Sequence, residues 1–260
     1  MTSIVLNEND WAREQINNRN LGVKPYETFC RIARYYLDNG DNKKEVRKKL
    51  DSFLLLCEPT ASLPKWSNTI DNALSKAIKC RAIDIEYIPI TRPEMEIIDE
   101  LKGRQLQRLA FTLLCLAKYW DLVNAHGDHW VNSRDTDIMR MANINTSVKR
   151  QSLMYHTLNE LGLIRFSKKI DNTNVRVQFI TDGQEALQVS DFRNLGYQYL
   201  MYHGEPYYVC QNCGLTVKDN GRTSGRKPKY CNKCAIEIYM QQTVNSVMRH
   251  RSIKENKSCV

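Results

Sequence analysis

Four cysteines near the end of the 260-residue chain have the spacing of a metal site. Cys210 and Cys213 form one Cys-x-x-Cys pair, Cys231 and Cys234 form another, and seventeen residues separate the pairs. Two intervening residues let each pair present both sulfurs to one ion, so the two pairs complete a tetrahedral four-sulfur site. Zn²⁺ is the default ion because it needs no redox change, whereas iron in a rubredoxin-like site lacks its aromatic-rich context. We therefore predict one structural Zn²⁺ here.

A site closed by four thiolates has no coordination position for water, which argues against a zinc hydrolase. The sequence contains no glycine-rich phosphate loop, no Gly-x-Ser-x-Gly and no His-Glu-x-x-His. His126, Asp128 and His129 could hold a metal or transfer a proton, but a polar loop between two helices explains them as well. We expect a protein that is not an enzyme.

The elements that position the four thiols are short. Tyr207–Val209 is expected to be the strand that enters the first pair, and Gly214 follows that pair, where a positive φ is often needed. The loop between the pairs is polar and basic, and a helix with an apolar stripe follows Cys234. We predict a four-cysteine zinc ribbon with a C-terminal helix and a basic tail over residues 205–260. The loop residues expected to contact nucleic acid are Arg222, Arg226, Lys227 and Lys229.

The middle of the chain, residues 91–182, predicts a winged helix-turn-helix domain. Apolar residues recur at three- and four-residue steps over 103–120, which indicates a long helix. Two shorter helices follow, and then the period changes to two on either side of the turn residues 171–174. Three helices followed by a hairpin is the winged-helix order.

The last helix of this domain has cations and small polar groups at its N-terminal part, which suits the major groove of DNA. The hairpin carries further cations within reach of backbone phosphate. The same fold is also used for protein contact or dimerisation, and that alternative stays open. The candidate nucleic-acid contacts are Lys149, Arg150, Ser152 and His156 on the helix, and Lys168, Lys169 and Arg176 on the hairpin.

The charge of the chain is concentrated in these two segments. The formal net charge is +9, of which residues 205–260 carry +6 and residues 145–180 carry +4, so the remainder is slightly acidic. Two basic surfaces on a near-neutral body favour a polyanionic partner. We predict double-stranded DNA, although the sequence does not separate DNA from RNA.

The rest of the chain is expected to be helical, so the predicted fold is mainly α. Residues 1–90 are interpreted as a helical domain and 183–204 as a connecting segment. Four isolated cysteines in apolar helical patterns are expected to be buried and inert, and Cys259 is expected to be an exposed bystander. The four are Cys30, Cys57, Cys80 and Cys115.

The blocks Gly103–Trp120, Asn145–Met154 and Gly162–Lys169 resemble a poorly characterised group of phage and mobile-element proteins of Gram-positive bacteria. Lys24–Thr28 is similar to the N-terminal region of that group. Its members look like a helical domain, a winged helix and often a C-terminal zinc ribbon, so the resemblance covers most of the chain. It implies a phage setting and no established activity, although phage winged-helix proteins of this kind include replication organisers and transcriptional regulators.

These observations lead to one expectation about function and one alternative. We expect a non-enzymatic DNA-binding protein in the cytoplasm of a bacterial host, acting in replication initiation or transcriptional regulation. The alternative is an adaptor or inhibitor that binds a host or phage protein through the ribbon. No apolar stretch approaches the roughly 18 residues of a membrane span, so no membrane partner is expected, and a homodimer is compatible with either function.

Overall fold

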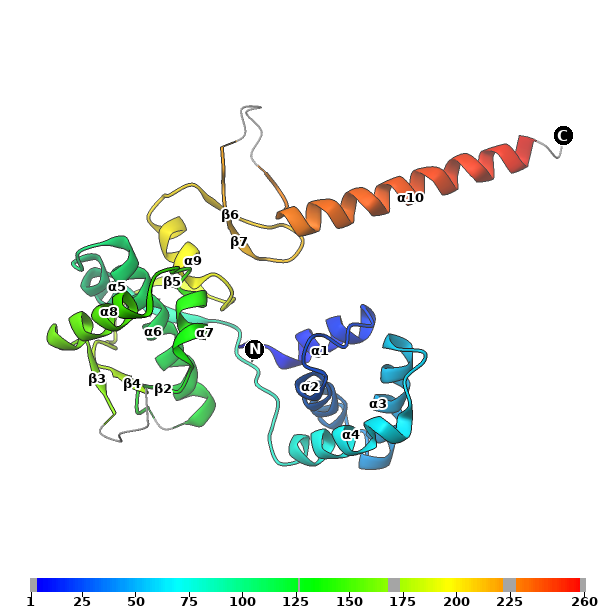
Figure 1. The fold of residues 1–260 in the computed structure, drawn as a ribbon, viewed down its shortest axis with the longest axis horizontal. Helices are drawn as coiled ribbons and strands as arrows, with labels where there is room; N and C mark the ends of the chain where they lie inside the picture. Colours follow the sequence, from blue (N-terminus) through cyan, green and yellow to red (C-terminus); the bar gives the residue numbers. More distant parts are fainter. Residues whose placement is uncertain (1–3, 126, 168–173, 222–227, 258–260) are drawn as a thin grey trace. The chain divides into compact units, whose positions relative to one another are not determined.

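The computed structural model describes residues 4–125, 127–167, 174–221 and 228–257, with side chains up to residue 248. In these ranges the protein is mainly helical, as predicted, with ten helices and three small sheets (Figure 1). The chain divides into two compact units. The first comprises Met1–Pro93, Cys115–Trp130 and Thr181–Phe192, and the second comprises Glu94–Leu114, Val131–Ile180 and Arg193–Val260. The four predicted domains 1–90, 91–182, 183–204 and 205–260 stay a prediction.

The first four helices form the core of the first unit. They are α1 (Glu8–Asn17), α2 (Pro25–Asp38), α3 (Lys43–Cys57) and α4 (Leu63–Ala77). Helix α2 contacts each of the other three. The buried ring of Phe29 packs edge-on against Phe53 and Trp66, with ring centroids 6.4 and 6.0 Å away.

The signals that start and end these helices are local and readable in the sequence. Pro25 occupies the first turn of α2, where no N–H is needed. Gly40 ends that helix with a φ of +91°, a conformation that glycine adopts without strain. Asn42 and Glu45 form a capping box at the start of α3.

One strand of a short sheet lies in segment 183–204, the segment expected to be a plain connection. Strand β1 (Ile88–Thr91) pairs antiparallel with β5 (Glu185–Val189), and Ile88 lies opposite Val189. The hydrophobic periodicity of the sequence does not predict this long-range pairing, because β5 is short and half-exposed. Segment 183–204 is therefore structured, with β5 followed by a further helix.

The middle of the chain runs helix, strand, helix, helix, strand, strand. After α5 (Arg92–Asp99), these are α6 (Arg104–Asn124), β2 (Trp130–Val131), α7 (Asp135–Met141), α8 (Val148–Glu160), β3 (Ile164–Phe166) and β4 (Val175–Val177). The three strands form one sheet in the order β2-β4-β3, and β3 pairs antiparallel with β4. The predicted change from helix to hairpin thus occurs after α8.

The residue pattern predicts an N-cap for α8 at Asn145 or Thr146 and places Leu161 on the buried face of Met154 and Leu158, and both predictions are wrong. The helix is capped by Ser147, whose hydroxyl accepts from the N–H of Arg150, and not by Asn145 or Thr146. Leu161 does not pack inward with Met154 and Leu158, because the helix ends at Glu160 and the C-cap Leu161 is 57% exposed. Gly162 has a φ of +73°, as expected of a helix stop.

The C-terminal elements are α9 (Leu195–Tyr202), β6 (Tyr207–Val209), β7 (Thr216–Lys218) and α10 (Asn232–Lys257). Strands β6 and β7 pair antiparallel, and α9 contacts both of them. The rings of Tyr197 and Tyr207 lie 4.8 Å apart. A Cβ at Gly196 would lie 2.0 Å from the carbonyl oxygen of Ala142, so glycine lets α9 contact the end of α7.

The isolated cysteines differ in burial. Cys30 and Cys115 are buried as predicted, while Cys57 is half-buried. Cys80 is exposed, contrary to the prediction, because α4 ends at Ala77 before the apolar stripe reaches it. Cys259 lies outside the described residues. Among the described helices, none has the length and apolar character needed to cross a membrane.

Candidate metal centre

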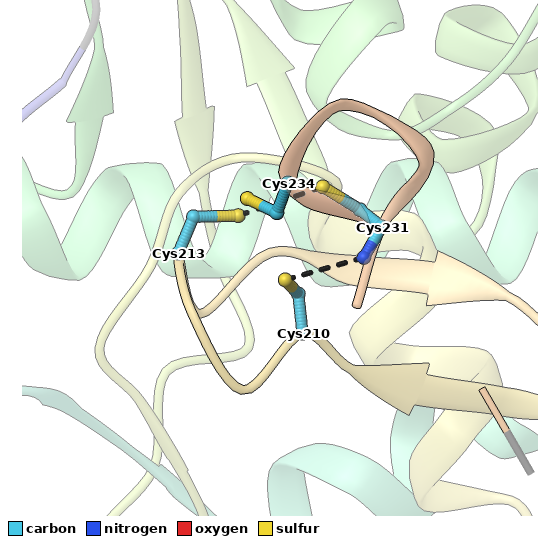
Figure 2. A group of neighbouring side chains, drawn as sticks. All are labelled: Cys210, Cys213, Cys231 and Cys234. Carbon is cyan, nitrogen blue, oxygen red and sulfur yellow. Dashed lines mark hydrogen bonds between the residues drawn. The ribbon is translucent and has the colours of Figure 1, made fainter. Parts of the chain in front are cut away.

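Two short structural elements bring the four cysteines together. Cys210 and Cys213 come from the turn that follows β6, and Cys231 and Cys234 come from the segment that begins α10. Figure 2 shows the four thiols gathered at one point. Cys210, Cys231 and Cys234 are buried, and Cys213 is half-buried. The spacing in the sequence therefore predicted a real cluster.

The distances between the sulfurs suit one tetrahedral ion. All four lie within 4.8 Å of one another, and Cys213 Sγ is 3.8 Å from Cys231 Sγ. A tetrahedral ion with four sulfurs at about 2.3 Å has sulfur–sulfur edges of about 3.8 Å. A disulfide would need about 2.05 Å, and the four residues are free thiols. The cluster is a candidate metal site compatible with one structural Zn²⁺.

Hydrogen bonds favour the thiolate form of Cys210. The N–H of Cys231 donates to Cys210 Sγ at 3.2 Å (Figure 2). Burial alone raises the pKa of Cys210, but the backbone N–H groups of Cys231, Cys213 and Asn212 outweigh it and lower that pKa to about 6. The side-chain amide of Asn212 donates to Cys234 Sγ at 3.4 Å.

The pKa of Cys213 shifts in the opposite direction. Burial, reinforced by the neighbouring thiols, raises the pKa of Cys213 to about 12. Four thiolates this close repel one another, so all four ionise together only when a positive ion lies between them. With a divalent ion the site has a formal charge of −2, and every position of a tetrahedral ion is filled by protein.

Backbone contacts hold the two cysteine pairs in register. The N–H of Gln211 donates to the carbonyl of Lys229 at 2.9 Å, which joins the first pair to the residues before the second. Gly214 has a φ of +71° and donates its N–H to the carbonyl of Cys210. Arg193 donates to the carbonyl of Cys213 at 2.5 Å, which ties the turn to the segment that precedes α9.

The predicted contacts on α8 all lie on its exposed surface. Lys149, Arg150, Ser152 and His156 are exposed. The hydroxyl of Ser152 donates to the carbonyl of Val148 at 3.2 Å, so it keeps only acceptor capacity for a partner. The ring of His156 lies 5.4 Å from the ring of Phe166 on β3, which places it between helix and hairpin.

The hairpin contains one cation that sequence reasoning missed. Arg165 lies directly opposite the predicted Arg176 in the β3–β4 register. Arg165 is exposed, and the buried Nε of Arg176 has no hydrogen-bond acceptor in the described part of the chain. The alternating apolar and polar residues predict the two strands that contain these arginines. The pattern does not show which residues of the two strands lie opposite each other.

Other predicted contacts fall in or near the loops. Lys229 is exposed at the end of the loop between the two cysteine pairs. Lys168, Lys169, Arg222, Arg226 and Lys227 lie outside the described residues.

No protein-family model, curated protein or solved structure matches this chain. Two features of the chain can do chemistry: the four thiols that can hold one ion, and a set of cations on α8 and the β3–β4 hairpin.

Proposed function

We propose that the chain is a non-enzymatic DNA-binding protein of phage or mobile-element type, acting in replication initiation or transcriptional regulation. In this proposal the DNA-binding part is a winged helix-turn-helix within residues 91–182, and the basic C-terminal segment is a zinc ribbon. The phage setting rests on the resemblance of three sequence blocks. The DNA partner rests on the observations that follow.

The order of elements supports a winged helix. Helix α6, strand β2, helices α7 and α8 and the hairpin β3–β4 follow one another. In the sheet order β2-β4-β3 the first strand lies beside the last, so β2 and the hairpin form one small sheet. In a helix-turn-helix the second of two short helices enters the major groove. Here that helix is α8, and its exposed N-terminal turn carries Lys149 and Arg150.

The single observation that carries the proposal is the pair of arginines on the hairpin. Arg165 and Arg176 are cross-strand neighbours, and like charges directly opposite each other destabilise a sheet. An anion between the two guanidinium groups removes that cost. Backbone phosphate is such an anion, and the N-terminal end of α8 offers further cations.

The four cysteines would hold one Zn²⁺, which supplies a fixed, redox-inert centre for the ribbon when bound. The chain itself does the rest. Strands β6 and β7 and the first turn of α10 present the thiols, and Lys229 lies two residues before the second pair. A basic loop fixed at both ends by metal ligands would add phosphate contacts without base reading.

Charge-removal variants test the DNA partner. Lys149→Ala/Arg150→Ala and Arg165→Ala/Arg176→Ala should each weaken duplex binding about tenfold or more. The matched control is Lys43→Ala/Lys44→Ala, which removes two exposed charges from α3 and should leave affinity unchanged. Equal losses in all three double variants would mean that net charge, and not this surface, binds DNA.

The adaptor or inhibitor function remains the second candidate because of two apolar side chains. Val148 and Leu153 on α8 are 76% and 64% exposed, which suits a protein partner as well as a thymine methyl group. A pull-down from host extract, with and without nuclease, separates the two functions. A partner that stays bound after nuclease treatment favours the adaptor, and one that is lost favours DNA.

A further inference from the structure

Helix α10 carries an exposed apolar surface that neither the metal site nor the DNA proposal uses. The helix has 26 residues, which corresponds to about 39 Å. Its first turn is fixed by Cys234 and by the bond from the N–H of Ala235 to the carbonyl of Cys231. Beyond that turn, every side chain up to residue 248 is exposed apart from half-buried Ile238. Most of the stability of protein helices comes from packing of an apolar face, so a partner on this face would stabilise α10.

Five large apolar side chains form this face, which we call the α10 stripe. They recur at three- and four-residue steps, so they lie on one side of the helix. They are Ile236 (55% exposed), Tyr239 (70%), Met240 (62%), Val244 (51%) and Val247 (45%). The hydroxyl of Thr243, at the centre of the stripe, donates to the carbonyl of Tyr239 at 2.9 Å and is thus satisfied within the helix.

The charges around the stripe favour a second copy of the same helix. The one charged residue from Ile236 to Val247 is Glu237, which pairs with Lys233 of the same helix at 3.8 Å, so two identical faces can meet with little like-charge repulsion. The polar side chains of Gln241, Gln242 and Asn245 lie on the opposite side of the helix, which is exposed to solvent. A two-fold interface requires one patch to complement itself, and an uncharged apolar stripe does so.

The spacing and area of the stripe suit a helix pair. Ile236, Met240, Thr243 and Val247 follow the alternating four- and three-residue steps of a heptad seam. Five side chains about half exposed offer on the order of 500 Å² per helix, so two copies bury about 1,000 Å², the size at which a specific interface begins. We propose that α10 pairs with α10 of a second copy through the α10 stripe, which makes the protein a homodimer independently of DNA.

The test is the mass of the metal-loaded full chain in solution, measured by sedimentation without DNA. The wild type should be a concentration-dependent dimer. Met240→Glu/Val247→Glu should weaken the dimer at least about 100-fold because two buried charges face their own copies. Gln241→Glu/Asn245→Glu adds the same charge to the opposite side and should leave the dimer intact.

Helicity by circular dichroism and the metal content of each variant show whether the chain remains folded. A wild type that stays monomeric at about 100 µM, far above the roughly micromolar dissociation constants of weak specific complexes, would overturn the proposal. Equal weakening by both double variants would also overturn it. Failure of DNA binding has no bearing on this measurement, so the two proposals fail separately.

Discussion

Asn143 donates through its side-chain amide to the side-chain oxygen of Asn194 at 2.9 Å, although 51 residues separate them. Both asparagines have left-handed backbone, with φ of 55° and 54°. Asn143 lies in the turn between α7 and α8, and Asn194 caps α9. The amide of Asn194 also donates to the carbonyl of Thr216 on β7 at 3.0 Å. Two side chains therefore join the helix-helix turn to the β6–β7 hairpin, whose turn carries Cys210 and Cys213.

Removing the Asn194 side chain should loosen this connection. Asn194→Gly permits the left-handed backbone and deletes both hydrogen bonds. We expect a loss of about 1–3 kcal/mol from the partners left unsatisfied, and faster hydrogen exchange in β7. Ala125→Gly is the control, because Ala125 also has a left-handed φ (54°) and its side chain makes no hydrogen bond. Equal rates of hydrogen exchange in β7 for both variants would contradict the proposed connection through Asn194.

The cysteine cluster should bind one ion per chain through all four thiols. Cys231→Ser removes one thiolate and should lower the zinc content well below one equivalent and destabilise the C-terminal segment. The control is Cys80→Ser, an exposed cysteine outside the cluster, which should keep full metal content. Elemental analysis measures both. A metal-free chain whose C-terminal segment stays folded would refute the metal centre.

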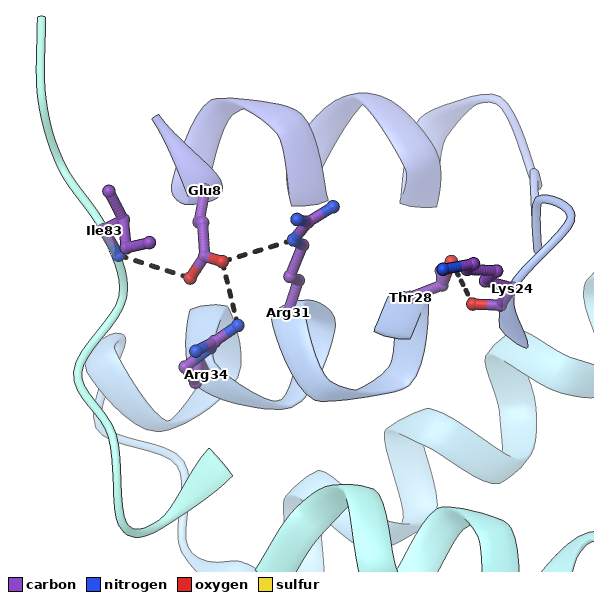
Figure 3. Close-up of polar contacts among 6 residues, drawn as sticks. All are labelled: Glu8, Lys24, Thr28, Arg31, Arg34 and Ile83. Carbon is purple, nitrogen blue, oxygen red and sulfur yellow. Dashed lines mark hydrogen bonds and ion pairs between the residues drawn. The ribbon is translucent and has the colours of Figure 1, made fainter. Parts of the chain in front are cut away.

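A buried carboxylate stabilises the first unit. Glu8 is 3% exposed and accepts from Arg31 at 3.2 Å and Arg34 at 2.8 Å, and its other oxygen accepts the N–H of Ile83 at 3.2 Å (Figure 3). It thereby links α1, α2 and the segment after α4. Arg31 also lies over the ring of Trp11 at 4.9 Å.

Neutralising that carboxylate should be costly. Glu8→Gln leaves two guanidinium groups against an uncharged side chain, and breaking a buried pair costs about 3–5 kcal/mol. Asp10→Asn is the matched control, because the Asp10–Arg13 pair is about two-thirds exposed (67% and 60%) and such pairs contribute about 0–1 kcal/mol. Chemical denaturation measures both changes. A loss at Glu8 no larger than at Asp10 would show that the network adds nothing.

These networks mark the limit of what the sequence predicts. Capping residues, the proline at α2 and the two cysteine pairs act through neighbours along the chain, so the helices and the metal ligands were predictable. The Asn143–Asn194 contact, the Glu8 network and the register that pairs Arg165 with Arg176 depend on residues brought together only by folding. The residue pattern did not predict helix α9, because this helix depends on its contacts with β6 and β7 and not on a pattern of its own.

Alkaline pH should destabilise the first unit through Tyr119. Burial, with a smaller contribution from Glu8, raises the pKa of Tyr119 to about 12. The unfolded phenol ionises near pH 10, so the stabilisation is complete below that pH and is lost as pH rises through about 12. Near pH 12 the loss is about 2 kcal/mol. Tyr119→Phe should flatten the pH profile between 10 and 12, and Tyr239→Phe, which is 70% exposed in the wild type, should not change it.

The proposed binding of DNA phosphate by α8 and the hairpin is tested by the salt dependence of the affinity for duplex DNA. Counterion release gives a slope of about −0.9 per phosphate neutralised in a plot of log affinity against log salt. Lys149, Arg150, Arg165 and Arg176 together therefore predict a slope of about −3 to −4 or steeper. Lys149→Ala/Arg150→Ala should reduce the steepness by about 2, with no change in Lys43→Ala/Lys44→Ala. Binding that is absent, insensitive to salt, or equally affected by both double variants would contradict the claim.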